Sequence, residues 1–169
     1  MWPSAVSLVQ TLKQAHAAGI GRLGFDLFFK QDGCIVAAGS ADRMNPHFVV
    51  ARYRPDGSPD TSFGGKGSVA AAFQGGSGGA HAVVIQPDGS IVVGGSGYAQ
   101  PTSTDADVVG GFAVLRYRSD GVLDTTFGNA GTVLMSVGDA GGAVNALGMW
   151  PDGRIVAAGL ANFRAPQTR

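Results

Sequence analysis

The stretch RYRPDGSPDTSFGG at residues 52–65 returns as RYRSDGVLDTTFGN at residues 116–129, and nine of the fourteen positions are identical. A second signature occurs three times, as DGCIVAAG at 32–39, DGSIVVGG at 88–95 and DGRIVAAG at 152–159. Signatures that recur in a fixed order are typical of chains built from structural repeats. The sequence is therefore an array of similar units.

The spacing of the Asp-Gly pairs defines the length of one unit. Asp32 and Asp56 are 24 residues apart and Asp56 and Asp88 are 32 apart, which adds up to a period of 56. From Asp88 to Asp120 the spacing is 32 instead of 24, so the middle copy carries eight more residues, within 96–111. We expect a single repeat-built β domain over 1–169, with an irregular segment at 1–21 and units at about 22–66, 67–130 and 131–169.

Each full unit is predicted to hold four short antiparallel strands bounded by Gly or Asp-Gly. In the turn at 86–89, proline sets φ, Asp88 caps backbone N–H groups and Gly89 takes a positive φ, which predicts a tight hairpin. The opening strand of the first copy would come from 4–11, unless a short helix forms at 8–18. The other strands are expected at 24–30, 34–40, 48–54, 67–73, 80–86, 90–97, 111–118, 131–137, 143–149 and 154–160.

Side-chain alternation predicts how the sheets pack. Phe48 and Val50 share one face of their strand, and Val49, Ala51 and Tyr53 share the other. Apolar groups on both faces require cover on both sides, as in sheets stacked around an axis. The predicted fold is all-β, with about two and three-quarter β-propeller-like blades. Such a count leaves three alternatives open: a piece of a longer array, self-association to complete a propeller, or an open stack.

Two segments resemble the delta-60 repeat family of bacterial β-propeller-like proteins: QPDGSIVVGG at 86–95 and FAVLRYRSDGVLDTTFG at 112–128. The resemblance extends over about 24–160. It implies a propeller-like β fold, a secreted or cell-surface location in bacteria, and no established catalytic activity.

Composition excludes several classes of function. The chain has 12 Lys+Arg against 12 Asp+Glu, so it lacks the positive charge on which nucleic-acid binding depends. Its one cysteine can form neither an internal disulfide nor a thiolate zinc cluster. It holds no run of eighteen apolar residues, so membrane insertion is not expected. Residues 1–21 lack the pattern of a signal peptide, since Lys13, Gln14 and His16 interrupt them.

Charged and aromatic residues that recur in every unit are expected to build the unit rather than to act on a substrate. We predict that the aspartates of the five Asp-Gly pairs cap turns. We predict ion pairs between Arg52 and Asp60 and between Arg116 and Asp124, both eight residues apart. Phe63 and Phe127 are expected to anchor neighbouring sheets.

The residues that do not recur are weak candidates for chemistry. His16, His47 and His81 share no metal-ligand spacing, and Cys34 has no evident base. The glycine-rich stretch at 74–79 lacks the Lys-Ser/Thr of a phosphate loop. No catalytic, cofactor-binding or metal-binding residue is therefore assigned, and no cofactor is expected.

The inserted loop is the remaining candidate site. It is expected to be solvated, with partner contact or calcium binding as alternatives. Its candidate contact residues are Tyr98, Thr102, Thr104, Asp105 and Asp107.

These observations favour a non-enzymatic β-repeat module that serves as a scaffold or binds a protein or glycan partner through its loops. The alternative is a hydrolase or lyase with its site in a central propeller channel. That alternative needs converging carboxylates or histidines from several blades, and the sequence shows no such set.

Overall fold

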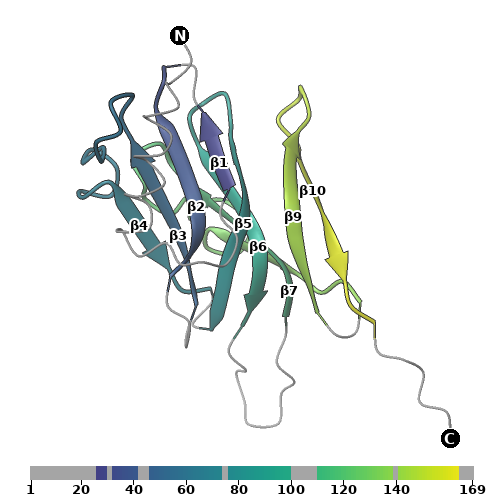
Figure 1. Ribbon diagram of the computed structural model, residues 1–169. Coiled ribbons are helices and arrows are strands. Elements are labelled where there is room, and N and C mark those ends of the chain that lie inside the picture. Colours follow the sequence, from purple (N-terminus) through teal and green to yellow (C-terminus); the bar gives the residue numbers. More distant parts are fainter. Residues whose placement is uncertain are drawn as a thin grey trace, which may run out of the picture.

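The protein is described by a computed structural model that covers residues 26–29, 32–41, 46–73, 76–99, 110–138 and 141–163 (Figure 1). These residues form ten β-strands and no helix, so no helix in the described part of the chain could cross a membrane. The strands are β1 (Asp26–Phe29), β2 (Ile35–Ala41), β3 (His47–Tyr53), β4 (Ser68–Ala71), β5 (Ser77–Ile85), β6 (Ile91–Tyr98), β7 (Gly110–Tyr117), β8 (Thr132–Met135), β9 (Gly142–Met149) and β10 (Ile155–Ala161).

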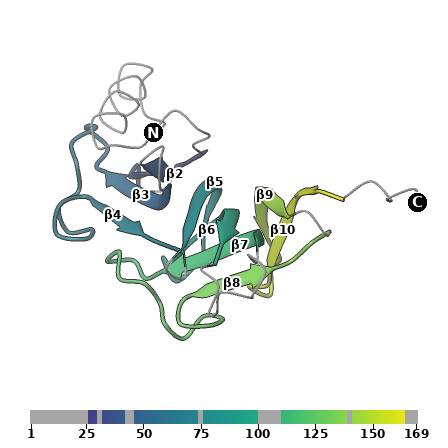
Figure 2. The ribbon, with the colours of Figure 1, turned by 90° about the horizontal axis from the view of Figure 1, so that it is seen from below.

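The strands form three antiparallel sheets. Two have four strands each, in the orders β1-β2-β3-β4 and β5-β6-β7-β8, and the third contains β9 and β10. Every pairing between neighbours in the chain is antiparallel. Viewed from below, the sheets lie side by side in chain order, like successive blades (Figure 2). The predicted all-β, propeller-like fold is confirmed.

The sheets divide the strands differently from the sequence-based expectation. Residues 67–73 were expected to open the second sheet, but β4 closes the first, with Phe48 opposite Ala71 and Ala51 opposite Ser68. The reason is that the loop after β3 folds back on it, since the Arg52 N–H donates to the Gly67 carbonyl at 2.9 Å. The four strands of the first sheet, β1 to β4, therefore all lie within 26–71. The predicted strand at 4–11 and helix at 8–18 lie outside the described residues.

Neighbouring sheets pack face to face, and the alternation of side chains decides which residues meet. Phe48 and Val50 lie in the core cluster between the first and second sheets, whereas Val49, Ala51 and Tyr53 form a cluster on the other face of the first sheet. The predicted division of β3 into two apolar faces is therefore confirmed. The second sheet in turn packs against β9 through a third cluster.

A β-bulge recurs in the first strand of the second and third sheets. Ala80 pairs with Gly95 and Ala82 pairs with Gly94, so His81 has no opposite residue. Asn145 is skipped in the same way between β9 and β10. A bulged residue has no partner to match, which explains why the repeats tolerate His and Asn at equivalent positions.

The bulge brings the backbone so close that only glycine fits opposite it. A Cβ placed on Gly95 would lie 1.8 Å from the carbonyl oxygen of Gly79. We expect Gly95→Ala to lower the free energy of unfolding by about 1–3 kcal/mol, as overpacking does, measured by urea denaturation. Gly148→Ala is the control, because nothing lies within 4 Å of a Cβ there. Equal effects of the two substitutions would contradict this account.

Candidate functional site

All five aspartates of the Asp-Gly pairs cap their own turns. In each case the Oδ1 atom accepts a hydrogen bond from the backbone N–H two residues later, at 2.8–3.1 Å. The glycine that follows each aspartate has a φ of +82° to +90°. The predicted capping role is confirmed at Asp32, Asp56, Asp88, Asp120 and Asp152.

These turns lie at one end of the sheets. Tyr53 at the end of β3 pairs with Ile35 at the start of β2, so the turn before β2 and the loop after β3 are neighbours. A Cβ on Gly33 would lie 3.2 Å from the Pro55 ring, and the second sheet repeats this proximity between Gly89 and Ser119. We call this the Asp-Gly end. The sequence at this end repeats from unit to unit, as expected for residues that build the fold.

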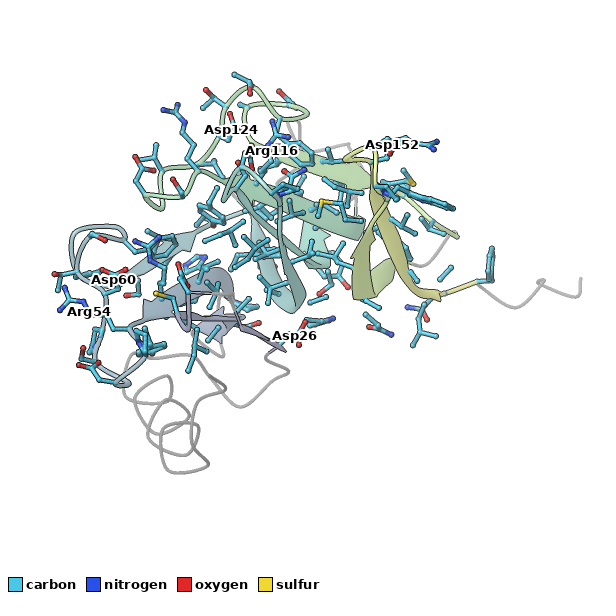
Figure 3. The ribbon with its side chains drawn as sticks, turned by 90° about the horizontal axis from the view of Figure 1, so that it is seen from above. Asp26, Arg54, Asp60, Arg116, Asp124 and Asp152 are labelled. Atoms are coloured by element: carbon cyan, nitrogen blue, oxygen red, sulfur yellow. The ribbon has the colours of Figure 1, made fainter. Side chains whose placement is uncertain are left out.

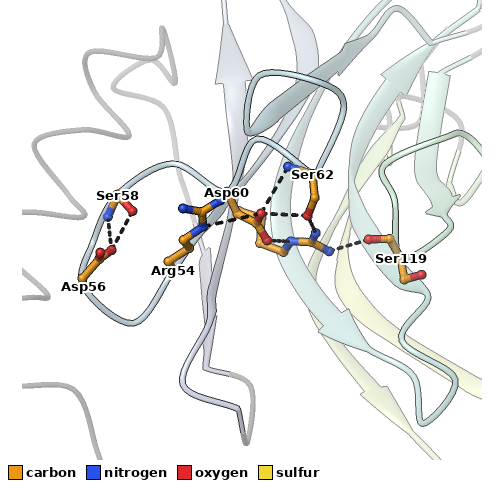
Figure 4. Close-up of polar contacts among 7 residues, drawn as sticks. Arg54, Asp56, Ser58, Asp60, Ser62 and Ser119 are labelled. Atoms are coloured by element: carbon orange, nitrogen blue, oxygen red, sulfur yellow. Dashed lines mark hydrogen bonds and ion pairs between the residues drawn. The ribbon is translucent and has the colours of Figure 1, made fainter.

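An arginine–aspartate corner follows β3. The Arg52 Nε donates to Asp60 Oδ2 at 2.7 Å, and its guanidinium lies 5.0 Å from the centre of the Phe63 ring. Ser62 adds two hydrogen bonds to Asp60 Oδ1, from its hydroxyl at 2.7 Å and its N–H at 3.2 Å (Figure 4). Arg54 contributes only a 3.9 Å contact from a half-exposed side chain. The predicted Arg52–Asp60 ion pair is confirmed.

The second sheet builds the same corner. Arg116 Nε donates to Asp124 Oδ2 at 2.7 Å, and its guanidinium lies 4.7 Å from the centre of the Phe127 ring. Thr126 takes the place of Ser62, with its hydroxyl 2.7 Å from Asp124 Oδ1. Figure 3 shows Arg116 beside Asp124, which lies in the loop after β7, and Asp60 in the loop after β3. The predicted Arg116–Asp124 pair is confirmed.

Contacts between the sheets run from the first corner to the turn of the second sheet. The Gly64 N–H donates to the Asp120 carbonyl at 2.9 Å, and Arg52 Nη1 donates to the Ser119 carbonyl. The Phe63 ring is fully buried, and a Cβ on Gly121 would lie 3.1 Å from it. Phe63 is therefore an anchor between the sheets, as predicted. Phe127 packs into the cluster between the second and third sheets but is only half-buried.

The sequence reasoning missed these backbone contacts, since a carbonyl acceptor carries no residue signature. It also missed Asp26, which does not recur. Asp26 lies in β1, and its Oδ2 accepts a hydrogen bond from the Val83 N–H in β5 at 3.0 Å. That contact joins the opening strands of two neighbouring sheets.

The end opposite the Asp-Gly end carries the connections that differ between units. Tyr98 ends β6, pairs with Gly110 at the start of β7, and is 45% exposed. The inserted residues therefore enter and leave at this end, which we call the variable end. Of the predicted contact residues, Tyr98 lies there, whereas Thr102, Thr104, Asp105 and Asp107 lie outside the described residues.

The remaining candidates do not converge. His47 begins β3, His81 is the bulged residue of β5, and Cys34 is half-buried directly after a turn. Within the described ranges, no three His, Cys, Asp or Glu side chains gather where they could hold a metal ion. His16 and residues 74 and 75 of the glycine-rich stretch lie outside those ranges.

The hydrogen bonds at the corners hold the carboxyl groups in their ionised form. The Thr126 hydroxyl is the largest cause that lowers the pKa of Asp124, with the Thr126 N–H and Arg116 adding to it. Ser62 does the same for the pKa of Asp60, and Ser58 for that of Asp56. A lowered pKa stabilises the folded state above the ordinary carboxyl value of 3.8 and stops doing so as pH falls through the folded value.

We therefore expect the melting temperature to fall as the pH drops below about 4. Thr126→Ala should raise the pKa of Asp124 toward 3.8 in a carboxyl-carbon NMR titration, and should flatten this acid-induced loss. Thr125→Ala, at the neighbouring exposed position, is the control and should leave the titration unchanged. An unaltered Asp124 titration in Thr126→Ala would overturn the assignment.

Comparison with known proteins bears on the first two repeat units. Residues 30–63 and 86–127 match the model of a family described as "Domain of unknown function (DUF5122) beta-propeller". Comparisons with curated proteins and with solved structures gave no match. The two matched segments contain four of the five Asp-Gly turns, at 32–33, 56–57, 88–89 and 120–121, and both arginine–aspartate corners. The resemblance to β-propeller repeats is confirmed: two segments of this chain, in its first and second repeat units, are similar to the DUF5122 β-propeller family.

Proposed function

We propose that this chain is a non-enzymatic β-repeat module, in which the Asp-Gly end and the stacked sheets are the scaffold and the variable end binds a protein or glycan partner. In line with the family resemblance, we propose that it works outside the cell or at the cell surface. The observation that carries the proposal is that the two ends of the sheets differ. Internal contacts engage the acidic side chains of the Asp-Gly end, whereas the variable end carries an exposed aromatic side chain.

At the Asp-Gly end, the acidic side chains are engaged by the protein itself. Each turn aspartate accepts a hydrogen bond from its own backbone, and Asp60 and Asp124 are ion-paired. A general acid needs a pKa raised toward the working pH, but those of Asp56, Asp60 and Asp124 are lowered. These carboxylates suit a structural role.

At the variable end, an aromatic side chain stands free of the core. Tyr98 is 45% exposed although it lies on a strand whose register is set by eight pairs with β7. Aromatic side chains held on rigid elements dominate many protein interfaces, because they bury a large area at little entropic cost. Tyr98 and the connection that follows it are therefore the best-placed contact surface.

The test is a binding screen with a matched pair of variants. Immobilised peptide and glycan arrays would be probed with the labelled chain, with Tyr98→Ala and with Trp150→Ala. Trp150 is the control because it is another exposed aromatic residue, 55%, beside the turn at the Asp-Gly end. We expect the labelled chain to bind some array members. The binding signal should be about tenfold weaker for Tyr98→Ala, as for an interface anchor, and unchanged for Trp150→Ala.

Two results would overturn the proposal. The first is binding that survives both Tyr98→Ala and replacement of 102–107 by a short Gly-Ser link, in variants shown to fold by circular dichroism. The second is turnover of glycosides, esters or lactones, with or without divalent cations, by the purified chain.

A further inference from the structure

The face of the first sheet that points away from the second sheet is buried. We call it the outer face. Within the described ranges, its apolar cluster holds residues of β2 and β3 alone: Ile35, Ala37, Val49, Ala51 and Tyr53. These five residues are only 0–4% exposed. Side chains on one face of a sheet are buried only where another part of the molecule lies on that face.

The short connections beside the outer face cannot cover it. Residues 30–31 and 42–45 lie in the connections that join β2 to its neighbours, one at each end of the strand. Ile35 and Tyr53 pair at the Asp-Gly end and Ala41 and His47 pair at the variable end, about 20 Å away. Four residues span at most about 14 Å, so neither connection extends over the whole cluster.

Residues 1–25 adjoin the outer face. They lead directly into β1, whose first residue, Asp26, pairs with Ala38 in β2. The other stretches outside the described ranges come after Phe73, where the chain continues into the second and third sheets. The second sheet packs against the opposite face of the first. By position and length, residues 1–25 are therefore the candidate for the cover.

The outer face differs in shape from its counterpart in the second sheet. At its centre Ala37 pairs with Ala51, where the second sheet has Val93 paired with Leu115. Nearer the variable end the first sheet has the larger residue, Val49. Because interiors are close-packed, the short side chains at the centre leave room for large side chains from the covering segment. The outer face therefore suits a cover other than a repeat sheet.

The sequence of residues 1–25 suits this face. It contains neither of the two repeat signatures and no Asp or Glu. Leu8, Leu12 and Ala15 are spaced by four and three, which places side chains on one side of a helix. Gln10 and Gln14 fall on the other side of the same pattern. A helix at 8–18 would be about 16 Å long, which is comparable with the length of the cluster along β3.

We propose that residues 1–25 are an internal docking segment that covers the outer face of the first sheet, with Leu8 and Leu12 packed over Ala37 and Ala51. The segment takes the position on the first sheet that the first sheet takes on the second. It does so without the sequence of a repeat unit. The outer face is thereby occupied by this chain itself and is closed to other partners.

The direct test is nuclear Overhauser spectroscopy on the full chain with labelled Ile, Leu and Val methyl groups. We expect contacts from Leu8 or Leu12 to Ile35 and Val49, and none to Ile91, whose side chain packs between the first and second sheets. Absence of any contact from 1–25 to the outer face would overturn the proposal. So would contacts that arise only between differently labelled chains in a mixed sample, because they would assign the cover to a second copy.

The tyrosines provide a second readout, the exposure of each ring to a soluble paramagnetic agent. Tyr53 lies on the outer face, Tyr117 is buried between the sheets and Tyr98 is exposed. In Leu12→Asp a carboxylate cannot stay buried against the apolar face. The Tyr53 ring should therefore lose its protection and relax nearly as fast as that of Tyr98, whereas Tyr117 should keep its protection because the sheets remain packed.

Gln14→Asp is the matched control, since it adds the same charge two residues away, on the polar side of the helical pattern. It should leave Tyr53 protected. Equal effects of the two substitutions, or a Tyr53 ring still protected in Leu12→Asp, would contradict the proposal. A loss of protection at Tyr117 as large as that at Tyr53 would also contradict it, because the segment would then support the whole fold rather than this face.

Discussion

The hydrogen-bonded ion pair between a strand-ending arginine and the aspartate eight residues later is the contact on which this architecture depends. Arg52–Asp60 and Arg116–Asp124 have the same 2.7 Å geometry and the same hydroxyl support. The pair folds the loop back beside its own strand, so that β4 and β8 complete their sheets. It also places the guanidinium of Arg52 where Nη1 donates to the Ser119 carbonyl of the next repeat unit.

This arrangement separates structure from the proposed binding surface. At the Asp-Gly end, the turn aspartates and the two corner aspartates have partners within their own unit, so they can repeat without change. At the variable end, the strands are connected by segments of different length, and an exposed Tyr98 stands on a strand of fixed register. A rigid sheet that carries variable connections is a common way to place recognition residues.

Local features of the fold could be predicted from sequence because their partners are close along the chain. The turn aspartates accept a hydrogen bond from the N–H two residues later, and the ion pairs span eight residues. Both partners of each contact therefore lie within one repeat of the sequence. Assignment of residues 67–73 to the first sheet could not be predicted, because period and composition do not say which neighbour a strand joins. The cross-sheet contact of Asp26 with Val83 was hidden for the same reason.

The sequence by itself determined the all-β repeat, the positions of its strands and the chemistry of its turns, because alternation, glycine placement and short-range hydrogen bonding are local properties. Only the tertiary structure decided which strands share a sheet and which apolar surfaces are covered. IVAAG is buried at 35–39 and exposed at 155–159. Burial depends on the strands beside a segment and on the sheet that faces it, and the five residues themselves specify neither.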